Sequence, residues 1–202
     1  MPPICAYVSR KKRSKPAPRV SVFWPAQARG YTGPDDLTLG QSIEVGVENL
    51  DTEIQAALGR LTRDADGGVV DGERVTVVGL SAGSLVVTEV LRDMADDADA
   101  ADRDDIEFIV VADSSRQEII DDTENYNPDY DYTYRPAPET VYDTTVVTGE
   151  YDGMADFPDR WWNVTAVTNA MAGAIFQIEP AMGAFQGMIA PTTPTGSRTV
   201  CE

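Results

Sequence analysis

The chain of 202 residues contains no histidine, and this absence removes the side chain that most often serves as a general base or metal ligand near neutral pH. Its two cysteines, Cys5 and Cys201, are too few for a disulfide framework or a structural zinc site. No run approaches the roughly 18 consecutive apolar residues of a membrane helix, and no signal-peptide pattern is present. We therefore expect a soluble protein that is not exported by the general route and needs neither metal nor cofactor.

Charge is unevenly distributed along the chain. Residues 1–34 contain seven basic residues and no acid, whereas the remainder contains nine bases against 34 acids. All three lysines lie within the first 15 residues. We interpret residues 1–19 as a basic, proline-containing arm on an acidic body. Because so acidic a body repels nucleic acid, we expect the arm to contact protein in a homo-oligomer or another assembly; a solvated tail is the alternative.

Past the arm, strand-like and helix-like segments alternate. Short runs rich in β-branched residues alternate with stretches whose apolar residues recur every three or four positions. This order predicts one α/β domain over residues 20–190 with a largely parallel sheet, followed by an irregular tail over residues 191–202. The expected strands are residues 20–24, 74–78, 106–112 and 144–148, and the expected helices are residues 37–61, 84–94 and 161–176.

One motif is typical of a catalytic site. It is the G-x-S-x-G pattern formed by Gly79, Ser81 and Gly83. It follows an expected strand and opens an expected helix, which is the context of a nucleophile elbow. The sharp turn requires small residues on both sides of the serine, since strand and helix approach each other closely there. The pattern therefore predicts that Ser81 is a nucleophile; a tight turn that contains a serine by coincidence is the alternative.

The same turn predicts an oxyanion hole. The backbone N–H of Ala82 would lie at a helix N-terminus, where a developing negative charge is stabilised. A second donor is expected from the loop after the first expected strand, residues 25–30. Because Pro25 has no N–H, the candidates there are Ala26 and Gln27.

Three further segments accompany the elbow in a recognisable order. They are residues 36–51 (DLTLGQSIEVGVENLD), residues 111–116 (VADSSR) and residues 151–158 (YDGMADFP), the last followed by NAMAG at 169–173. With the elbow, these segments resemble the PE-PPE domain, a mycobacterial family of serine α/β-hydrolases related to cutinases. The resemblance implies an α/β-hydrolase-like three-layer fold with a mostly parallel central sheet. It also implies an esterase or lipase-like protein that acts on acyl esters.

The resemblance also implies roles for individual residues. Ser81 corresponds to the nucleophile and Asp152 to the triad acid, with Asp156 as the alternative acid. In the relatives a histidine follows the NAxAG helix, but here that stretch contains Gln177 and Glu179. Glutamine cannot accept a proton, and a carboxylate of ordinary pKa is a poor base, so Glu179 is a weak candidate.

Loss of the base in a serine hydrolase costs on the order of 10⁶ in turnover. We therefore expect a catalytically impaired relative that serves as a structural or binding module. The alternative is an active serine esterase that uses Glu179 or a base supplied by a partner. The chain also resembles the product of a bacteriophage gene, because it lacks the usual PE or PPE region, and that resemblance implies a virion or tail component.

The loop over residues 121–142 is a second candidate functional region. Its tyrosines alternate with acidic residues and prolines. Located between two expected strands, it is long enough to cross the carboxyl end of the sheet, where ligands bind in open α/β folds. Tyrosine suits recognition surfaces, so a lid or a protein contact is expected, with a surface loop that has no partner as the alternative. The tyrosines are Tyr126, Tyr130, Tyr132, Tyr134 and Tyr142.

Overall fold

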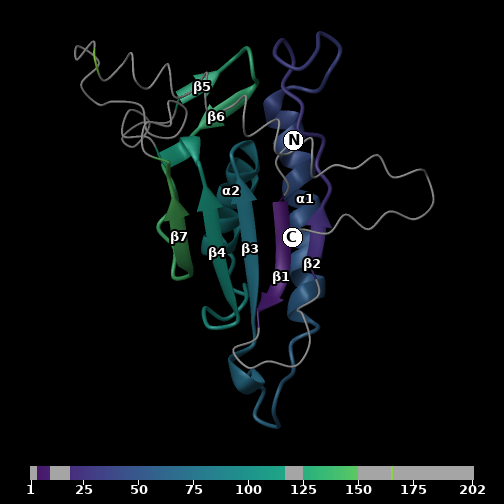
Figure 1. Ribbon diagram of the computed structural model, residues 1–202, viewed down its shortest axis with the longest axis vertical. Helices are drawn as coiled ribbons and strands as arrows, with labels where there is room; N and C mark the ends of the chain where they lie inside the picture. The colour runs from purple at the N-terminus through teal and green to yellow at the C-terminus, as the bar shows by residue number, and fades with distance from the viewer. Residues whose placement is uncertain (1–3, 10–18, 117–124, 150–164, 166–202) are drawn as a thin grey trace, which may run out of the picture.

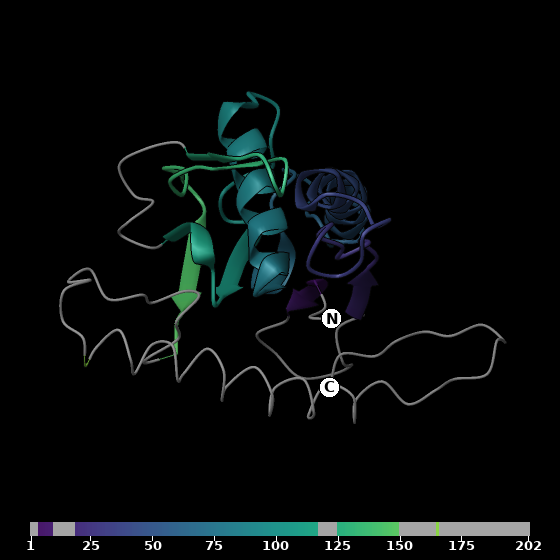
Figure 2. The same ribbon diagram turned by 90° about the horizontal axis from the view of Figure 1, so that it is seen from above.

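A five-stranded sheet with helices packed on one face forms the centre of the fold (Figures 1 and 2). The structure, a computed structural model, describes residues 4–9, 19–116, 125–149 and 165. Across the sheet the strand order is β2-β1-β3-β4-β7. The strands are β1 (Ile4–Ser9), β2 (Arg19–Val22), β3 (Arg74–Leu80), β4 (Ile106–Val111) and β7 (Asp143–Val147), and the helices are α1 (Leu39–Leu58) and α2 (Ala82–Asp96).

The sheet is mostly parallel, as the sequence predicts. β3 pairs in parallel with β4, and β4 with β7. β1 is antiparallel to both β2 and β3, so it alone runs against the direction of the other four strands. The expected α/β fold class is therefore confirmed, and the carboxyl ends of β3, β4 and β7 meet at one edge.

The amino-terminal segment differs from the expected arm. Residues 4–9 form β1, which lies inside the sheet between β2 and β3. The boundary at residue 19 is therefore wrong, and the basic residues 10–18, which lie outside the described residues, connect two neighbouring strands. The run ICAYVS has strand composition, but its partner β3 lies some 65 residues further along the chain and the adjacent basic run hides the pattern.

Helix α1 begins at a capping box. The Thr38 side chain accepts a hydrogen bond from the Gln41 N–H at 3.2 Å, and the Gln41 side chain accepts one from the Thr38 N–H at 3.1 Å. Two donors that a helix start leaves unpaired are thus satisfied. The buried stripe Ile43, Leu50 and Ile54 then turns one face of the helix toward the sheet.

The core lies between this helix layer and the sheet. Val77 of β3 and Phe108 of β4 are neighbours in register, and both side chains are fully buried. Leu50 and Leu91 from the two helices complete the same cluster. Burial of each such side chain contributes about 1.5–3 kcal/mol, so packing on this face holds the sheet and helices together.

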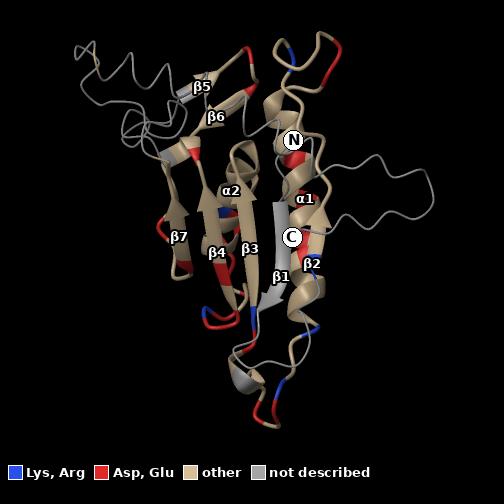
Figure 3. Cartoon of the chain, in the orientation of Figure 1, with Lys and Arg blue, Asp and Glu red and all other residues tan. Residues whose placement is uncertain are grey.

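The amino ends of the parallel strands carry charges (Figure 3). Arg74 of β3 lies 2.9 Å from the Glu107 carboxylate of β4 and 3.5 Å from the Asp143 carboxylate of β7. Glu107 also accepts a hydrogen bond from the Thr76 hydroxyl at 2.7 Å. These pairs link three adjacent strands at the end opposite Ser81, which leaves the carboxyl ends available for a site.

Some expectations concern residues that the structure does not describe. The expected helix at residues 161–176 lies outside the described residues except for Thr165, which is helical, and the tail at 191–202 lies wholly outside them. The sheet and one helix layer are therefore the two layers on view (Figure 2). Among the described helices, none is long and apolar enough to cross a membrane.

A second, two-stranded sheet packs on the helix layer. It is the hairpin of β5 (Asn125–Asn127) and β6 (Tyr132–Tyr134), which falls within the tyrosine-rich region. At the start of α1, the Gly40 N–H donates to the Tyr130 carbonyl at 3.1 Å. A Cβ on Gly40 would lie 1.9 Å from the carbonyl oxygen of Asp131, so this approach of hairpin to helix requires glycine.

Replacing Gly40 with alanine is therefore expected to displace the hairpin and lower the free energy of unfolding by about 1–3 kcal/mol. Gly59, at the other end of α1, is the matched control, because a Cβ there would meet only ordinary contacts, the nearest at 3.5 Å. Urea denaturation measures the free energy of unfolding of Gly40→Ala and of Gly59→Ala. Equal stability of the two variants would contradict the close approach.

Candidate functional site

The candidate site is built on the turn between β3 and α2. Ser81 is the single residue between the end of the strand and the first residue of the helix, and it is solvent-exposed. Its backbone has φ 54° and ψ −127°, a conformation that costs a residue other than glycine about 1–3 kcal/mol. Strand, strained serine and helix together have the geometry of a nucleophile elbow.

Two backbone hydrogen bonds hold the strained residue. The Ser81 N–H donates to the Val111 carbonyl at the end of β4 at 2.8 Å, and the Ser81 carbonyl accepts from the Ser84 N–H at 2.7 Å. The Ser81 side chain does not cap the helix, and no described residue is hydrogen-bonded to its hydroxyl. The Ser81 backbone is thus fixed in position, and its hydroxyl is not engaged by any base in the described part of the chain.

Gly79 shows why the motif requires glycine before the serine. A Cβ at this position would lie 2.7 Å from Val87 Cγ2, 2.8 Å from the Gly83 carbonyl oxygen and 2.9 Å from Ser84 Cα. Two of these three atoms belong to the first turn of α2, so any side chain at position 79 would push the helix away from the strand. Gly83 is buried within that first turn.

The structure separates the two candidates for the second oxyanion donor. The Gln27 N–H donates to the buried Ser42 hydroxyl at 2.9 Å, so it is already engaged. Ala26 has a positive φ of 52°, and its N–H has no acceptor among the described residues. As the first residue of α2, Ala82 has an N–H without an acceptor inside the helix. Ala82 and Ala26 are therefore the candidate donors that the geometry leaves open.

The remaining triad candidates, Asp152, Asp156 and Glu179, lie outside the described residues, as does Gln177. The strand that leads to them is described. Val147 of β7 is in register with Val111, which is in register with Leu80 beside Ser81. Asp152 follows Val147 by five residues in the sequence. The chain therefore leaves the sheet toward Asp152 from the edge that carries Ser81.

A residue that the sequence analysis did not single out also lies at this edge. Asp113 follows β4 by two residues and is 1% exposed. Its carboxylate accepts hydrogen bonds from the Thr88 hydroxyl at 2.9 Å and from the N–H and hydroxyl of Ser115 at 3.0 and 2.8 Å. In the sequence, Asp113 lies in the VADSSR segment directly after the expected strand at residues 106–112, but nothing there identified its partners.

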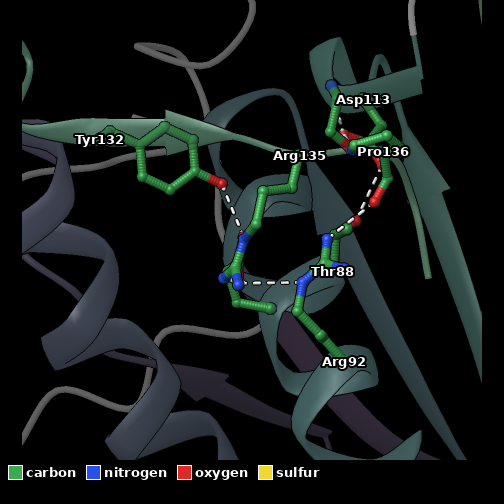
Figure 4. Close-up of polar contacts among 8 residues, drawn as sticks. Thr88, Arg92, Asp113, Tyr132, Arg135 and Pro136 are labelled. Carbon is green, nitrogen blue, oxygen red and sulfur yellow. Dashed lines mark hydrogen bonds and ion pairs between the residues drawn. The ribbon is translucent and has the colours of Figure 1, made fainter. Parts of the chain in front are cut away.

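The tyrosine-rich region is packed against α2 rather than open. Tyr132 is 8% exposed and its hydroxyl donates to Glu89 Oε1 at 2.9 Å; Arg135 bonds the other oxygen of the same carboxylate (Figure 4). Tyr142 is also buried, whereas Tyr126 is 56% exposed. Between α1, α2 and this hairpin lies a cavity of about 630 Å³, and Ser81 is not among its lining residues.

The buried tyrosine predicts alkaline sensitivity. Burial, together with the Glu89 carboxylate, raises the pKa of Tyr132 above its ordinary value. Because the folded state retains the phenol proton that the unfolded state releases above pH about 10, this contribution to stability is complete below that pH and is lost as the pH rises. Above pH 10, the free energy of unfolding of the wild type should fall by up to about 1.4 kcal/mol per pH unit more steeply than that of Tyr132→Phe. Parallel pH profiles from urea titrations would contradict this.

Known proteins resemble this chain in sequence. The family model of the PE-PPE domain matches residues 16–198. Among curated relatives from Mycobacterium tuberculosis, the chain is 36% identical over 138 residues to the uncharacterized PPE family protein PPE63, covering 67% of this chain and 26% of that protein. It is 32% identical to SL1278 acyltransferase Chp1, covering 74% and 33% respectively, and 30% identical to Esterase PE16, covering 77% and 28%.

The chain thus spans between about a quarter and a third of the length of these relatives. The family match covers most of the chain and includes the β3–Ser81–α2 elbow and the carboxyl ends of β4 and β7. Two of these relatives are named for reactions that transfer or cleave acyl groups. By this match and by its α/β-hydrolase-like architecture, the chain belongs to the PE-PPE domain family.

Proposed function

We propose that this chain is an acyl-ester-binding α/β-hydrolase module in which Ser81 is still presented as a nucleophile but turnover is strongly impaired. The observation that carries the proposal is the exposed, strained Ser81 in a chain with no histidine. An imidazole takes the serine proton during attack and returns it to the leaving group. Of the residues near the expected place of the histidine, Gln177 and Ile178 can do neither, and Glu179 is a poor base.

The expected rate enhancements favour impaired turnover over an intact triad mechanism. An oxyanion hole and a binding cleft without the triad supply about 10³–10⁴ over the uncatalysed reaction, whereas loss of the base costs on the order of 10⁶. The Ala82 N–H at the start of α2 and the Ala26 N–H, which has no acceptor among the described residues, are the donors we assign to the first contribution. The relatives named as esterase and acyltransferase support acyl esters as the class of ligand.

Restoring the base tests this proposal. Histidine is introduced singly at Gln177, Ile178 and Glu179, and labelling of Ser81 by a fluorophosphonate is followed by intact mass. We expect at least one variant to label about 10²–10⁴ times faster than the wild type, because that is the usual contribution of a positioned general base.

Ser81→Ala in each background is the matched control and should abolish labelling. Wild-type labelling as fast as that of the best histidine variant would overturn the proposal in favour of an active esterase with another base. If none of the three variants gains reactivity, the loss extends beyond the base.

A role in a protein assembly is a second proposed function, favoured by the charge distribution. Residues 10–15 contain five bases and connect β1 to β2. Ser9 pairs with Arg74 at the amino end of β3, so the connection starts at the opposite end of the sheet from Ser81. A contact made there with the acidic body of another copy leaves the Ser81 edge free, as a binding module within a phage particle would require.

Mass photometry at low and high salt tests this second role. We expect oligomers at 0.05 M salt that dissociate near 1 M, where charge interactions are screened within about 3 Å. A variant with Lys11, Lys12 and Lys15 changed to glutamine should be monomeric at both. A wild-type monomer at low salt would contradict the assembly role. Absence of the chain from purified phage particles would contradict its phage setting.

A further inference from the structure

Asp113 has the environment of a carboxylate that organises its surroundings. The side chains of Thr88 and Ser115, which donate to it, are as deeply buried as Asp113 itself, each 1% exposed. Thr88 belongs to α2, the helix that directly follows Ser81, while Ser115 belongs to the short 3-10 turn Ser114–Arg116 after β4. Figure 4 shows Thr88 on the helix facing Asp113 in the turn after β4. One carboxylate therefore ties the nucleophile-bearing helix to that turn.

The turn after β4 contains a second strained residue. Ala112 has φ 52°, a left-handed conformation that costs energy in a residue with a Cβ. It lies between Val111, whose carbonyl accepts the Ser81 N–H, and Asp113. The Ala112 N–H donates to the Val147 carbonyl of β7 at 2.9 Å. The direction in which the Val111 carbonyl points thus depends on a conformation that Ala112 adopts only under constraint from both sides.

Ser84 adds a direct contact between the elbow and the end of β4. Its hydroxyl is fully buried and lies 2.9 Å from the Gly79 carbonyl oxygen and 2.9 Å from the Val111 carbonyl oxygen. Ser84 and Thr88 are four residues apart on α2 and so lie on the same helix face. That face presents two successive hydroxyl groups, one to the Val111 carbonyl and the next to Asp113.

We propose that Asp113 is a positioning residue for the nucleophile elbow: held by Thr88, it fixes the turn after β4 in the conformation that keeps the Val111 carbonyl against the Ser81 N–H. Loss of the Thr88–Asp113 bond releases Ala112 from its strained φ and lets that carbonyl turn away. The Ser81 N–H then loses its acceptor, and the elbow relaxes from φ 54°. The consequence for reactivity at Ser81 rests on the proposed function, whereas the conformational coupling does not.

Three substitutions test the coupling. Thr88→Val keeps the shape of the side chain and removes the hydroxyl, Thr88→Ser keeps the hydroxyl, and Asp113→Asn changes the acceptor. Amide hydrogen exchange by NMR reports protection of the Ser81 and Ser84 N–H groups. We expect exchange at these two amides to accelerate about tenfold or more in Thr88→Val and Asp113→Asn, and to remain near the wild-type rate in Thr88→Ser.

The control separates positioning from general loss of stability. Ile106→Val truncates a fully buried side chain of β4 away from the elbow and sets the background acceleration for a mildly destabilised protein. The amides of Leu50 and Ile54 in α1 monitor global opening in every variant. Acceleration at Ser81 and Ser84 no larger than at these α1 amides, or equal in Thr88→Val and Ile106→Val, would overturn the positioning role.

Fluorophosphonate labelling of Ser81 in the same variants, in the most reactive histidine background, links the coupling to chemistry. We expect Thr88→Val to label at least about tenfold more slowly than Thr88→Ser. If the elbow amides respond as expected but no background labels at Ser81, the proposed function fails and the positioning inference stands. If Ser81 labels equally fast in Thr88→Val and Thr88→Ser and the elbow amides do not respond, the positioning inference fails and the proposed function stands.

Discussion

The hydrogen bond from the Ser81 N–H to the Val111 carbonyl is the contact on which the site depends. It joins a strained residue at the end of β3 to the end of β4, at the point where α2 begins. Gly79 allows that convergence because it has no side chain, and the packed sheet and helix layer supply the energy that the strain consumes. A fold that keeps this geometry keeps the serine presented to solvent whether or not a base is available.

The ion pairs of the sheet and the candidate site lie at opposite ends of the parallel strands. Ion pairs among Arg74, Glu107 and Asp143 link the amino ends of the parallel strands, while the carboxyl ends carry Ser81 and hydrogen-bonded polar groups. Because the chain contains no histidine, we propose a domain that binds an acyl group more readily than it turns it over. Family membership accounts for the architecture, and the absence of histidine is the basis of the proposed impairment.

Local sequence signals predicted much of this structure. The strand–Gly79–Ser81–helix pattern, the stripe through Ile43 and Leu50, and the apolar run of β4 each depend on neighbours along the chain, and all appear as expected. β1 and the β5–β6 hairpin were missed because long-range contacts form them: β1 needs β3 as a partner, and Tyr132 needs Glu89 of α2. Asp113 and the engagement of the Gln27 N–H by Ser42 required coordinates, since neither pair is close in sequence.

The proposed impairment of Ser81 is tested most directly by the steady-state release of p-nitrophenol from p-nitrophenyl acetate by the wild type and by Ser81→Ala. For an elbow and oxyanion hole without a base, we expect a Ser81-dependent rate no more than about 10³–10⁴ above the uncatalysed reaction. A Ser81-dependent turnover in the ordinary enzymatic range of about 1–10³ s⁻¹ would contradict it.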